Sequence, residues 1–177
     1  IRNLFSPILH DHYQFVAPYY RRYKLDGTIT NNIIYKMTRA LYGKRVRQPI
    51  GGDFALSSDV VNYIYNRDVW DTDVGRFGID IWLTTMALVK GFRICQTRLG
   101  AKVHDVKDPS QSLGPMFRQV VATMFSLMEE NQAFWRDVQG SEPIPVVGEE
   151  IQIEPKEFPI STGELIDSFL RGFQQFG

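Results

Sequence analysis

Three polar side chains suited to chemistry flank one apolar stretch of the chain, which runs from Gly75 to His104. Asp80 lies where the helical part of this stretch begins, and Lys102 and His104 follow its last apolar segment. Imidazole nitrogen binds Mn²⁺, and also Mg²⁺ when oxygen ligands complete the shell. His104 is therefore a candidate metal ligand, although a histidine in a polar loop beside Asp105 can also be purely structural.

A buried helix and a strand must position these side chains. Residues 81–89 are apolar on nearly every side of a helix, which is typical of a helix inside a larger body. Gly91 predicts the end of this helix, because glycine readily adopts the left-handed conformation that terminates helices. The alternation from Phe92 to Thr97 has a period of two and predicts a strand. Lys102 and His104 then lie just beyond its carboxyl end, the edge of an α/β sheet where ligands usually bind.

A second candidate site is the loop made of Gly27, Thr28, Ile29 and Thr30. Glycine permits a close approach of the backbone, and Thr30 is a suitable N-cap for a helix that ends at Gly43. Free backbone N–H groups at a helix start can bind a phosphate or a carboxylate. Most helices begin with such a cap and bind nothing, so the loop is either an anion cradle or only a cap.

A third candidate is the turn at Gly51, Gly52 and Asp53. Pro49 and the paired glycines exclude a central strand and require a sharp bend. Such a bend brings the backbone close either to another segment of the chain or to a ligand. A short helix capped by Ser57 or Ser58 is expected to follow.

Two further polar segments can have either an ordinary structural role or a functional one. Asp71 and Asp73 could hold a divalent cation, but aspartates before a glycine-bearing loop commonly cap and turn, and we favour this structural role. The basic and aromatic residues 18–24 follow a predicted strand at residues 13–17. They form either a solvated surface loop or a rim that faces an anion.

The composition limits the classes of function. The chain has 177 residues, 20 basic and 20 acidic, with 44% hydrophobic residues, so it predicts one domain with a substantial core. The balanced charge argues against a nucleic-acid binder or a polybasic membrane anchor. Cys95 is the single cysteine, which excludes an internal disulfide and suits a reducing cytoplasm. We expect a soluble, cytoplasmic protein, because there is neither a signal peptide nor a long apolar run.

The last third of the chain predicts two more helices. A polar loop through Pro109 precedes a long amphipathic helix, with Pro115 in its first turn. Beyond Gly140, two short β-like pieces are expected at residues 146–147 and 151–153. Ser161 and Glu164 match a capping box that opens a final helix. Its apolar stripe must pack on the domain or on a partner chain, for which a homodimer is one arrangement.

Five motifs in a fixed order resemble one group of glycosyltransferases. The motifs are Gly-Thr-Ile-Thr at residues 27–30, Arg-x-Arg-Gln-Pro-Ile-Gly-Gly-Asp at 45–53, Gly-Arg-Phe-Gly-Ile-Asp at 75–80, Leu-Gly-x-Lys-x-His at 99–104 and Met-Phe-Arg-Gln-Val-Val-Ala-Thr at 116–123. The chain is similar in these to retaining GT-A enzymes of the glucosyl-3-phosphoglycerate synthase type and their mannosyl-transferring relatives. The resemblance implies an α/β fold, here the acceptor-binding C-terminal half of a GT-A nucleotide-diphospho-sugar transferase with a helical extension.

The resemblance also implies roles for single residues. His104 would be a metal ligand, and Lys102 would reach the donor diphosphate, near the turn of Gly51, Gly52 and Asp53. Asp80 stands in the place of the family's Gly-x-Glu acid and would position or polarise the acceptor hydroxyl. Residues 27–30 resemble the loop that grips the acceptor's phosphate or carboxylate.

The family's Asp-x-Asp motif would fall before Ile1, so the resemblance implies that the chain is a fragment. Residues 1–138 would be the acceptor-side half, and residues 139–177 an extension packed on the domain or on a partner subunit. The implied function is retaining transfer of a hexose from a nucleoside-diphosphate sugar to a small anionic acceptor, of the 3-phosphoglycerate or glyceryl glycoside type. A divalent metal, Mg²⁺ or Mn²⁺, would assist. The alternative is a non-catalytic module that binds an anionic sugar or drives oligomerisation.

Overall fold

A mostly parallel sheet with helices on both faces forms the body of the protein, as shown by a computed structural model that describes residues 1–24, 26–102, 109–157 and 161–176. The strand order is β3-β1-β4-β6. The strands are β1 (Phe15–Arg21), β3 (Ala55–Leu56), β4 (Ile94–Ala101) and β6 (Val146–Val147). Only β3 runs antiparallel to its neighbour. The expected α/β class is therefore confirmed.

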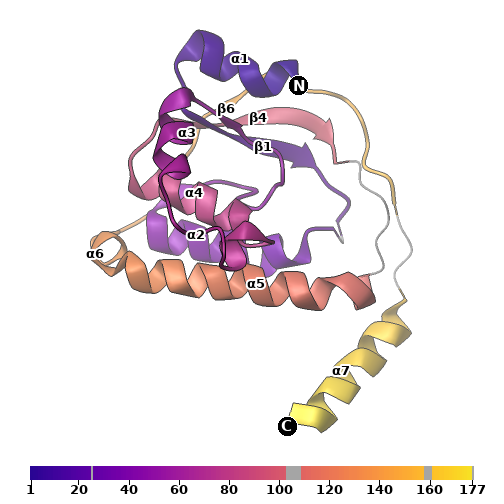
Figure 1. Ribbon diagram of the computed structural model, residues 1–177. Coiled ribbons are helices and arrows are strands. Elements are labelled where there is room, and N and C mark those ends of the chain that lie inside the picture. The colour runs from indigo at the N-terminus through magenta and orange to yellow at the C-terminus, as the bar shows by residue number, and fades with distance from the viewer. Residues whose placement is uncertain (25, 103–108, 158–160, 177) are drawn as a thin grey trace.

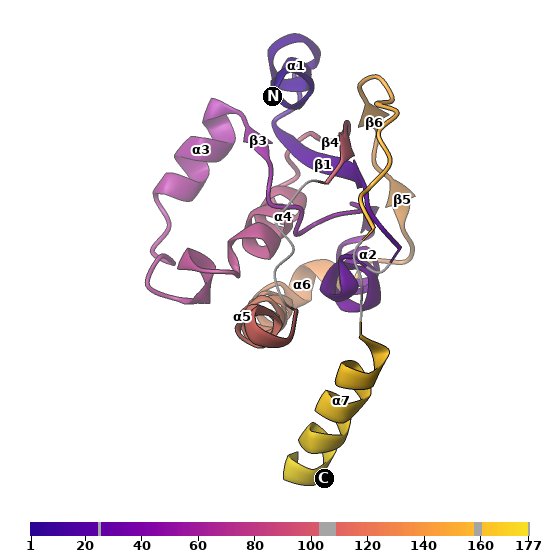
Figure 2. The ribbon, with the colours of Figure 1, turned by 90° about the vertical axis from the view of Figure 1, so that its right-hand side faces the viewer.

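Helices cover the two faces of the sheet unequally. Helix α1 (Arg2–Asp11) lies on one face, and α2 (Tyr35–Tyr42), α4 (Ile79–Val89) and α5 (Pro109–Glu130) lie beyond the other (Figure 1). Helix α3 (Ser58–Tyr65) and the short α6 (Gln132–Trp135) complete the body, with a second sheet of β2 (Lys44–Arg45) and β5 (Glu142–Pro143). Helix α7 (Thr162–Phe176) stands apart from the body in both views (Figures 1 and 2).

Helix α4 forms the centre of the core, as its apolar surface predicts. Ile81 and Thr84 are fully buried, and the helix packs between the sheet and α5. Gly91 has φ +70° and follows the end of the helix, so the predicted glycine terminus is confirmed. Asp80, however, lies in the first turn, and Gly78 occupies the N-cap position.

Strand β4 is longer and more deeply buried than its alternating sequence predicts. Cys95, Gln96 and Thr97 are all buried, because β4 is an inner strand covered on both faces. Near its carboxyl end the pairing with β1 shifts register between Tyr19 and Tyr20, where Gly100 has φ +77°. Such a bulge increases the local twist and redirects the residues that follow.

Several predicted boundaries differ from the observed ones. The helix of residues 28–42 begins at Thr28 and passes through one π-helical segment (Thr30–Ile34), so Thr30 is an interior residue and not the N-cap. Helix α5 starts at Pro109, which places Pro115 inside the helix. Residues 151–153 form no strand. Ser57 caps α3 as predicted, by accepting a hydrogen bond from the Val60 backbone N–H.

The chain after residue 138 divides into two parts. Strand β5 belongs to the two-stranded sheet, and β6 belongs to the main sheet. By contrast, the apolar side chains of α7 are 49–71% exposed; they are Leu165, Ile166, Phe169, Leu170 and Phe173. Ser161 caps α7 by accepting from the Glu164 backbone N–H at 3.3 Å, as predicted. Along the described part of the chain, no helix combines the length and the apolar character needed to cross a membrane.

Candidate functional site

Lys102 and the glycine turn meet at the carboxyl end of β4, although 49 residues separate Lys102 from Asp53. The Lys102 Nζ lies 2.6 Å from Asp53 Oδ2 and donates to the Gly51 carbonyl oxygen at 3.2 Å. The Lys102 backbone N–H donates to the Arg21 carbonyl, which holds the residue at the end of β1. An ammonium group has three N–H donors, and no acceptor among the described residues takes the third.

The turn at residues 51–53 requires glycine for two separate reasons. A Cβ on Gly51 would lie 2.2 Å from the Pro18 Cγ, inside the sum of the atomic radii. Gly52 has φ +85°, a conformation that L side chains rarely adopt. Thr84 of α4 donates its hydroxyl to the Pro49 carbonyl at 2.8 Å, which anchors the turn on the central helix. The predicted close approach of the backbone is therefore to another chain segment.

Tyr20 is a member of this site that the sequence did not single out. Its hydroxyl donates to Asp53 Oδ2 at 2.5 Å, and its ring lies 4.5 Å beneath the Lys102 Nζ. The buried Gln48 side chain accepts from the Tyr20 backbone N–H and donates to its carbonyl, so the residue is held on both sides. The only sequence signal was the run of basic and aromatic residues 18–24, which was expected to follow a strand at residues 13–17. Residues 18–21, Tyr20 among them, belong instead to β1.

Opposite influences set the charge of Asp53. Burial alone would raise the pKa of its carboxyl, but hydrogen bonds from Lys102 and Tyr20, together with the charges of Lys102 and Arg22, hold this pKa below its usual value. Burial and the Asp53 hydrogen bond raise the pKa of the Tyr20 hydroxyl. At neutral pH the cluster therefore contains an ammonium, a carboxylate and a neutral phenol.

Asp80 faces the same turn from the first turn of α4. Burial raises the pKa of its carboxyl to about 6, while the Gly52 backbone N–H and the Lys102 charge act in the opposite direction. The negative charge of Asp53 also raises it, so the two carboxylates influence each other. A carboxyl group with a pKa near neutrality, beside a cation and a turn of exposed backbone, is well suited to exchange a proton or to hold a hydroxyl group.

The loop at residues 27–30 opens only in part to solvent. Gly27 has φ +73° and Thr28 is exposed, whereas Ile29 and Thr30 are 7% and 4% exposed. The Asn31 backbone N–H donates to the Gly27 carbonyl at 2.8 Å, which closes the first helical turn. An anion at this loop would therefore meet Gly27 and Thr28, and the side chain of Thr30 belongs to the core.

Arg22 connects this loop with the cluster around Lys102. Its guanidinium pairs with Asp26 at 3.2 Å and packs against Gly27, while its charge lowers the pKa of both Asp53 and Tyr20. The Arg22 Nε is buried and has no hydrogen-bond partner among the described residues. The sequence placed this arginine only in a basic segment with two possible roles, and the structure brings it between the two candidate sites.

The described residues do not by themselves build a metal site. No three or more of their His, Cys, Asp and Glu side chains gather in one place. His104, the predicted ligand, lies outside the described residues. Asp73 begins a short 3-10 turn, as the favoured structural role predicts, but the cap is Thr72, whose hydroxyl accepts from the Val74 backbone N–H at 3.2 Å.

Comparisons with known proteins bear on the fold of the chain. No protein-family model matches the chain, and no curated protein matches it at a significant level. The chain is similar to a solved structure described as the crystal structure of a mycobacterial protein, with a TM-score of 0.53 and 26% sequence identity. The match covers 70% of this chain and 40% of the other, so the chain spans less than half of that protein. The likeness supports the α/β fold.

Proposed function

We propose that this chain is the acceptor-side half of a retaining GT-A glycosyltransferase. The substrates would be a nucleoside-diphosphate hexose and a small anionic acceptor, of the 3-phosphoglycerate or glyceryl glycoside type. One observation carries the proposal: Lys102, Asp80 and the turn of Gly51, Gly52 and Asp53 lie together at the carboxyl edge of the sheet. Three of the five motifs that resemble the family thus meet in one place.

Each member of the cluster suits one part of the transfer. The Lys102 ammonium, with one N–H left for a ligand, would bind the diphosphate and stabilise it as it leaves. Asp80, largely ionised at pH 7 because its pKa is about 6, would accept a hydrogen bond from the attacking hydroxyl group. Retention would follow from departure and attack on the same face of the sugar, so no covalent nucleophile is required.

The acceptor would lie toward Gly27, Thr28 and Arg22. An anionic group there would meet backbone N–H groups at a helix start and the guanidinium of Arg22.

A divalent metal remains part of the proposal through His104, which the resemblance to the family makes a ligand. When bound, it would neutralise charge on the leaving diphosphate. Within the described cluster, Asp53 is already engaged by Lys102 and Tyr20 and offers a poor ligand unless that pairing breaks.

The experiment is a transfer assay with the full-length protein, a panel of nucleoside-diphosphate sugars and a panel of small anionic acceptors. We expect turnover with one donor class in the presence of Mg²⁺ or Mn²⁺, and loss of turnover in Lys102→Gln. The matched control is Lys90→Gln, which removes a lysine that lies over the Tyr63 ring, outside the cluster. Absence of transfer with every pair, from folded protein that binds no nucleotide sugar, would reject the proposal.

The second candidate is a non-catalytic module that drives oligomerisation. Its supporting observation is the apolar face of α7, of which Phe169 and Phe173 are 71% and 65% exposed. A module of this kind would bind an anionic sugar without transferring it. The transfer assay and a measurement of molecular mass separate the two candidates.

A further inference from the structure

Two arginines converge on one serine at a site away from the Lys102 cluster. The Arg39 Nε donates to the Ser141 Oγ at 2.9 Å, and the Arg45 Nε donates to the same oxygen at 3.2 Å. The Arg45 Nη2 also donates to the Ser141 carbonyl oxygen at 3.0 Å. Two guanidinium groups of like charge are therefore held close together by a neutral residue.

Two more cations extend this group, and none of the carboxylates that the structure describes pairs with it. Lys36 is exposed one turn before Arg39 on α2, and Arg47 lies over the Tyr35 ring at 5.1 Å. Among the described residues, none of these four cations forms an ion pair. Glu142, the acidic residue next to Ser141, is taken by Lys44 at 2.6 Å.

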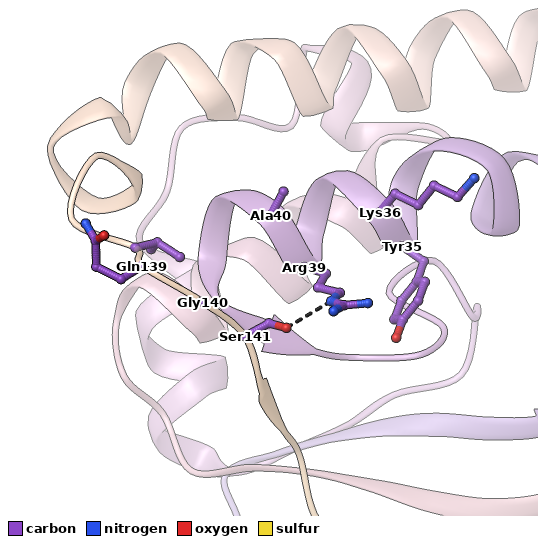
Figure 3. A pocket seen from close by; sticks show the side chains of 8 residues that line it. Tyr35, Lys36, Arg39, Ala40, Gln139, Gly140 and Ser141 are labelled. Atoms are coloured by element: carbon purple, nitrogen blue, oxygen red, sulfur yellow. Dashed lines mark hydrogen bonds between the residues drawn. The ribbon is translucent and has the colours of Figure 1, made fainter.

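A groove of about 480 Å³ runs between α2 and residues 138–141. Tyr35, Lys36, Arg39 and Ala40 line one wall, and the lining includes no acidic residue from the described part of the chain. Figure 3 shows the Arg39 side chain reaching across the groove to Ser141, with the Tyr35 ring beside it. This volume falls within the range of small-molecule sites and is larger than a single oxyanion needs.

We propose that this groove, here named the α2 groove, binds the phosphate group of a small molecule. Guanidinium groups match phosphate oxygens in fork geometry, and Arg39 uses only one of its five N–H donors on the described residues. Arg39 and Lys36 line the groove, and Arg45, which lies outside this lining, shares Ser141 with Arg39. A phosphate bound to Arg39 would supply the anion that the described residues lack. The Tyr35 ring and Ala40 would contact the less polar remainder of the molecule. The site does not depend on the proposed glycosyl transfer.

The test is a titration followed by NMR of backbone amides, at constant ionic strength maintained with chloride. The probes are inorganic phosphate and ribose 5-phosphate. We expect saturable shifts in residues 36–40 and 139–141, with a dissociation constant on the order of 1 mM or below. Tighter binding of the ester assigns the site to a phosphorylated metabolite, and tighter binding of the free ion assigns it to inorganic phosphate.

Three variants make the result specific. Arg39→Gln/Arg45→Gln should weaken binding at least tenfold, whereas Ser141→Ala, which removes the tether and keeps both cations, should change it by less than threefold. Arg67→Gln/Lys90→Gln loses the same charge from two residues that share the Tyr63 ring, and should bind normally. Shifts that do not saturate, equal weakening in this control, or loss of binding in Ser141→Ala would each overturn the assignment.

Because the Lys102 cluster also attracts anions, the titration is repeated with Lys102→Gln. Shifts at residues 36–40 and 139–141 that persist there place the ligand in the α2 groove. Their disappearance would mean that they report binding at the Lys102 cluster, and the inference would fail while the proposed function stood.

Discussion

The chemistry of the candidate site depends on how three charged side chains influence one another. Asp53 is held ionised by Lys102, while the partly buried Asp80 titrates near pH 6. Two carboxylates with pKa values pushed apart by their surroundings are a common arrangement where one must act on a proton and the other must hold a charge. The pKa values of both carboxyl groups can be measured without knowing the substrate.

The first prediction concerns the stability of Asp80→Asn as a function of pH. A carboxyl whose pKa is higher in the folded state binds protons more tightly there, so wild-type stability should fall as the pH rises from about 4 to about 6 and then level off. Asparagine cannot ionise and still accepts from the Gly52 N–H. At pH 8 the variant should therefore be more stable, by up to about 2 kcal/mol.

Urea unfolding at pH 4 and pH 8 provides the measurement, and the advantage of Asp80→Asn should vanish at the lower pH. In the proposed glycosyl transfer, Asp80→Asn should lower kcat about a hundredfold or more. A variant that keeps its turnover would leave Asp80 as a structural residue of the turn.

The second prediction concerns the pKa of Asp53. In Lys102→Gln this pKa should rise, because burial remains and both the charge and the strongest hydrogen bond are lost. Tyr20→Phe should raise it less, since only one neutral donor disappears. Carbon-detected NMR titration of the carboxyl group measures both shifts, and an unchanged value in Lys102→Gln would mean that the 2.6 Å pair does not form in solution.

At the scale of elements, the turn at residues 51–53 and the start of the helix at Thr28 define the two sides of the site. The turn is packed against β1 and anchored on α4, whereas the helix start is exposed at Thr28 and buried from Ile29 onward. The turn is thus held rigid by packing, whereas the helix start presents a short segment that a ligand can reach.

The third prediction follows from the contact of Gly51 with Pro18. In Gly51→Ala the new methyl group would lie 2.2 Å from the proline ring, which cannot rotate away, so the turn or β1 must shift. Overpacking of this kind costs about 1–3 kcal/mol or more. The control is Gly114→Ala in α5, where no atom lies within 4 Å and the exchange should stabilise by about 0.5–1 kcal/mol. Thermal unfolding compares them, and equal effects would contradict the close packing.

The fourth prediction separates the two threonines at the helix start. In the proposed glycosyl transfer, Thr28→Val should raise the KM for the acceptor more than tenfold, since a hydrogen bond to a charged group contributes about 1.5–3 kcal/mol. Thr30→Val should leave both KM values unchanged, because the side chain is buried. Steady-state kinetics with each substrate varied in turn is the measurement. If Thr28→Val changes the KM values for donor and acceptor equally, the loop acts only as the start of a helix.

At the scale of the whole molecule, the described chain consists of a packed body and one helix outside it. Strand β6, the last strand of the body, lies at one edge of the main sheet. Helix α7 follows it in the chain, and its apolar residues are largely exposed. A helix with an apolar face loses most of its tertiary stabilisation when that face is not covered. The sequence predicted that this face packs on the domain or on a partner chain, and the body described does not cover it.

The fifth prediction is that α7 mediates self-association. Sedimentation should show a mass that increases with concentration for the wild type and the mass of a single chain for Phe169→Glu/Phe173→Glu. Circular dichroism of the body should not change. The control Phe5→Glu removes an exposed phenylalanine from α1, 45% accessible, and should associate as the wild type does. A wild type that stays monomeric at high concentration would exclude the homodimer.

Local features of the protein were determined by the sequence alone. The burial of α4, the end marked by Gly91, the Ser57 and Ser161 caps and the bend at Gly52 were all predicted correctly. Each depends on side-chain period, cap chemistry or glycine conformation within about four residues, so neighbours along the chain are sufficient. Because these predictions used only neighbouring residues, they misplaced the starts of two helices where tertiary packing decides the boundary, at Thr30 and Pro115.

Only the tertiary structure decided which polar residues share a site. The pairing of Lys102 with Asp53, the hydroxyl of Tyr20 on the same carboxylate and the position of Arg22 between two loops join segments far apart in sequence. The raised pKa of Asp80 likewise comes from burial in the folded protein, which outweighs the lowering effect of the Gly52 backbone N–H, 28 residues earlier in the chain. Burial and Coulomb interactions depend on distance in space, and the strand order β3-β1-β4-β6 sets those distances.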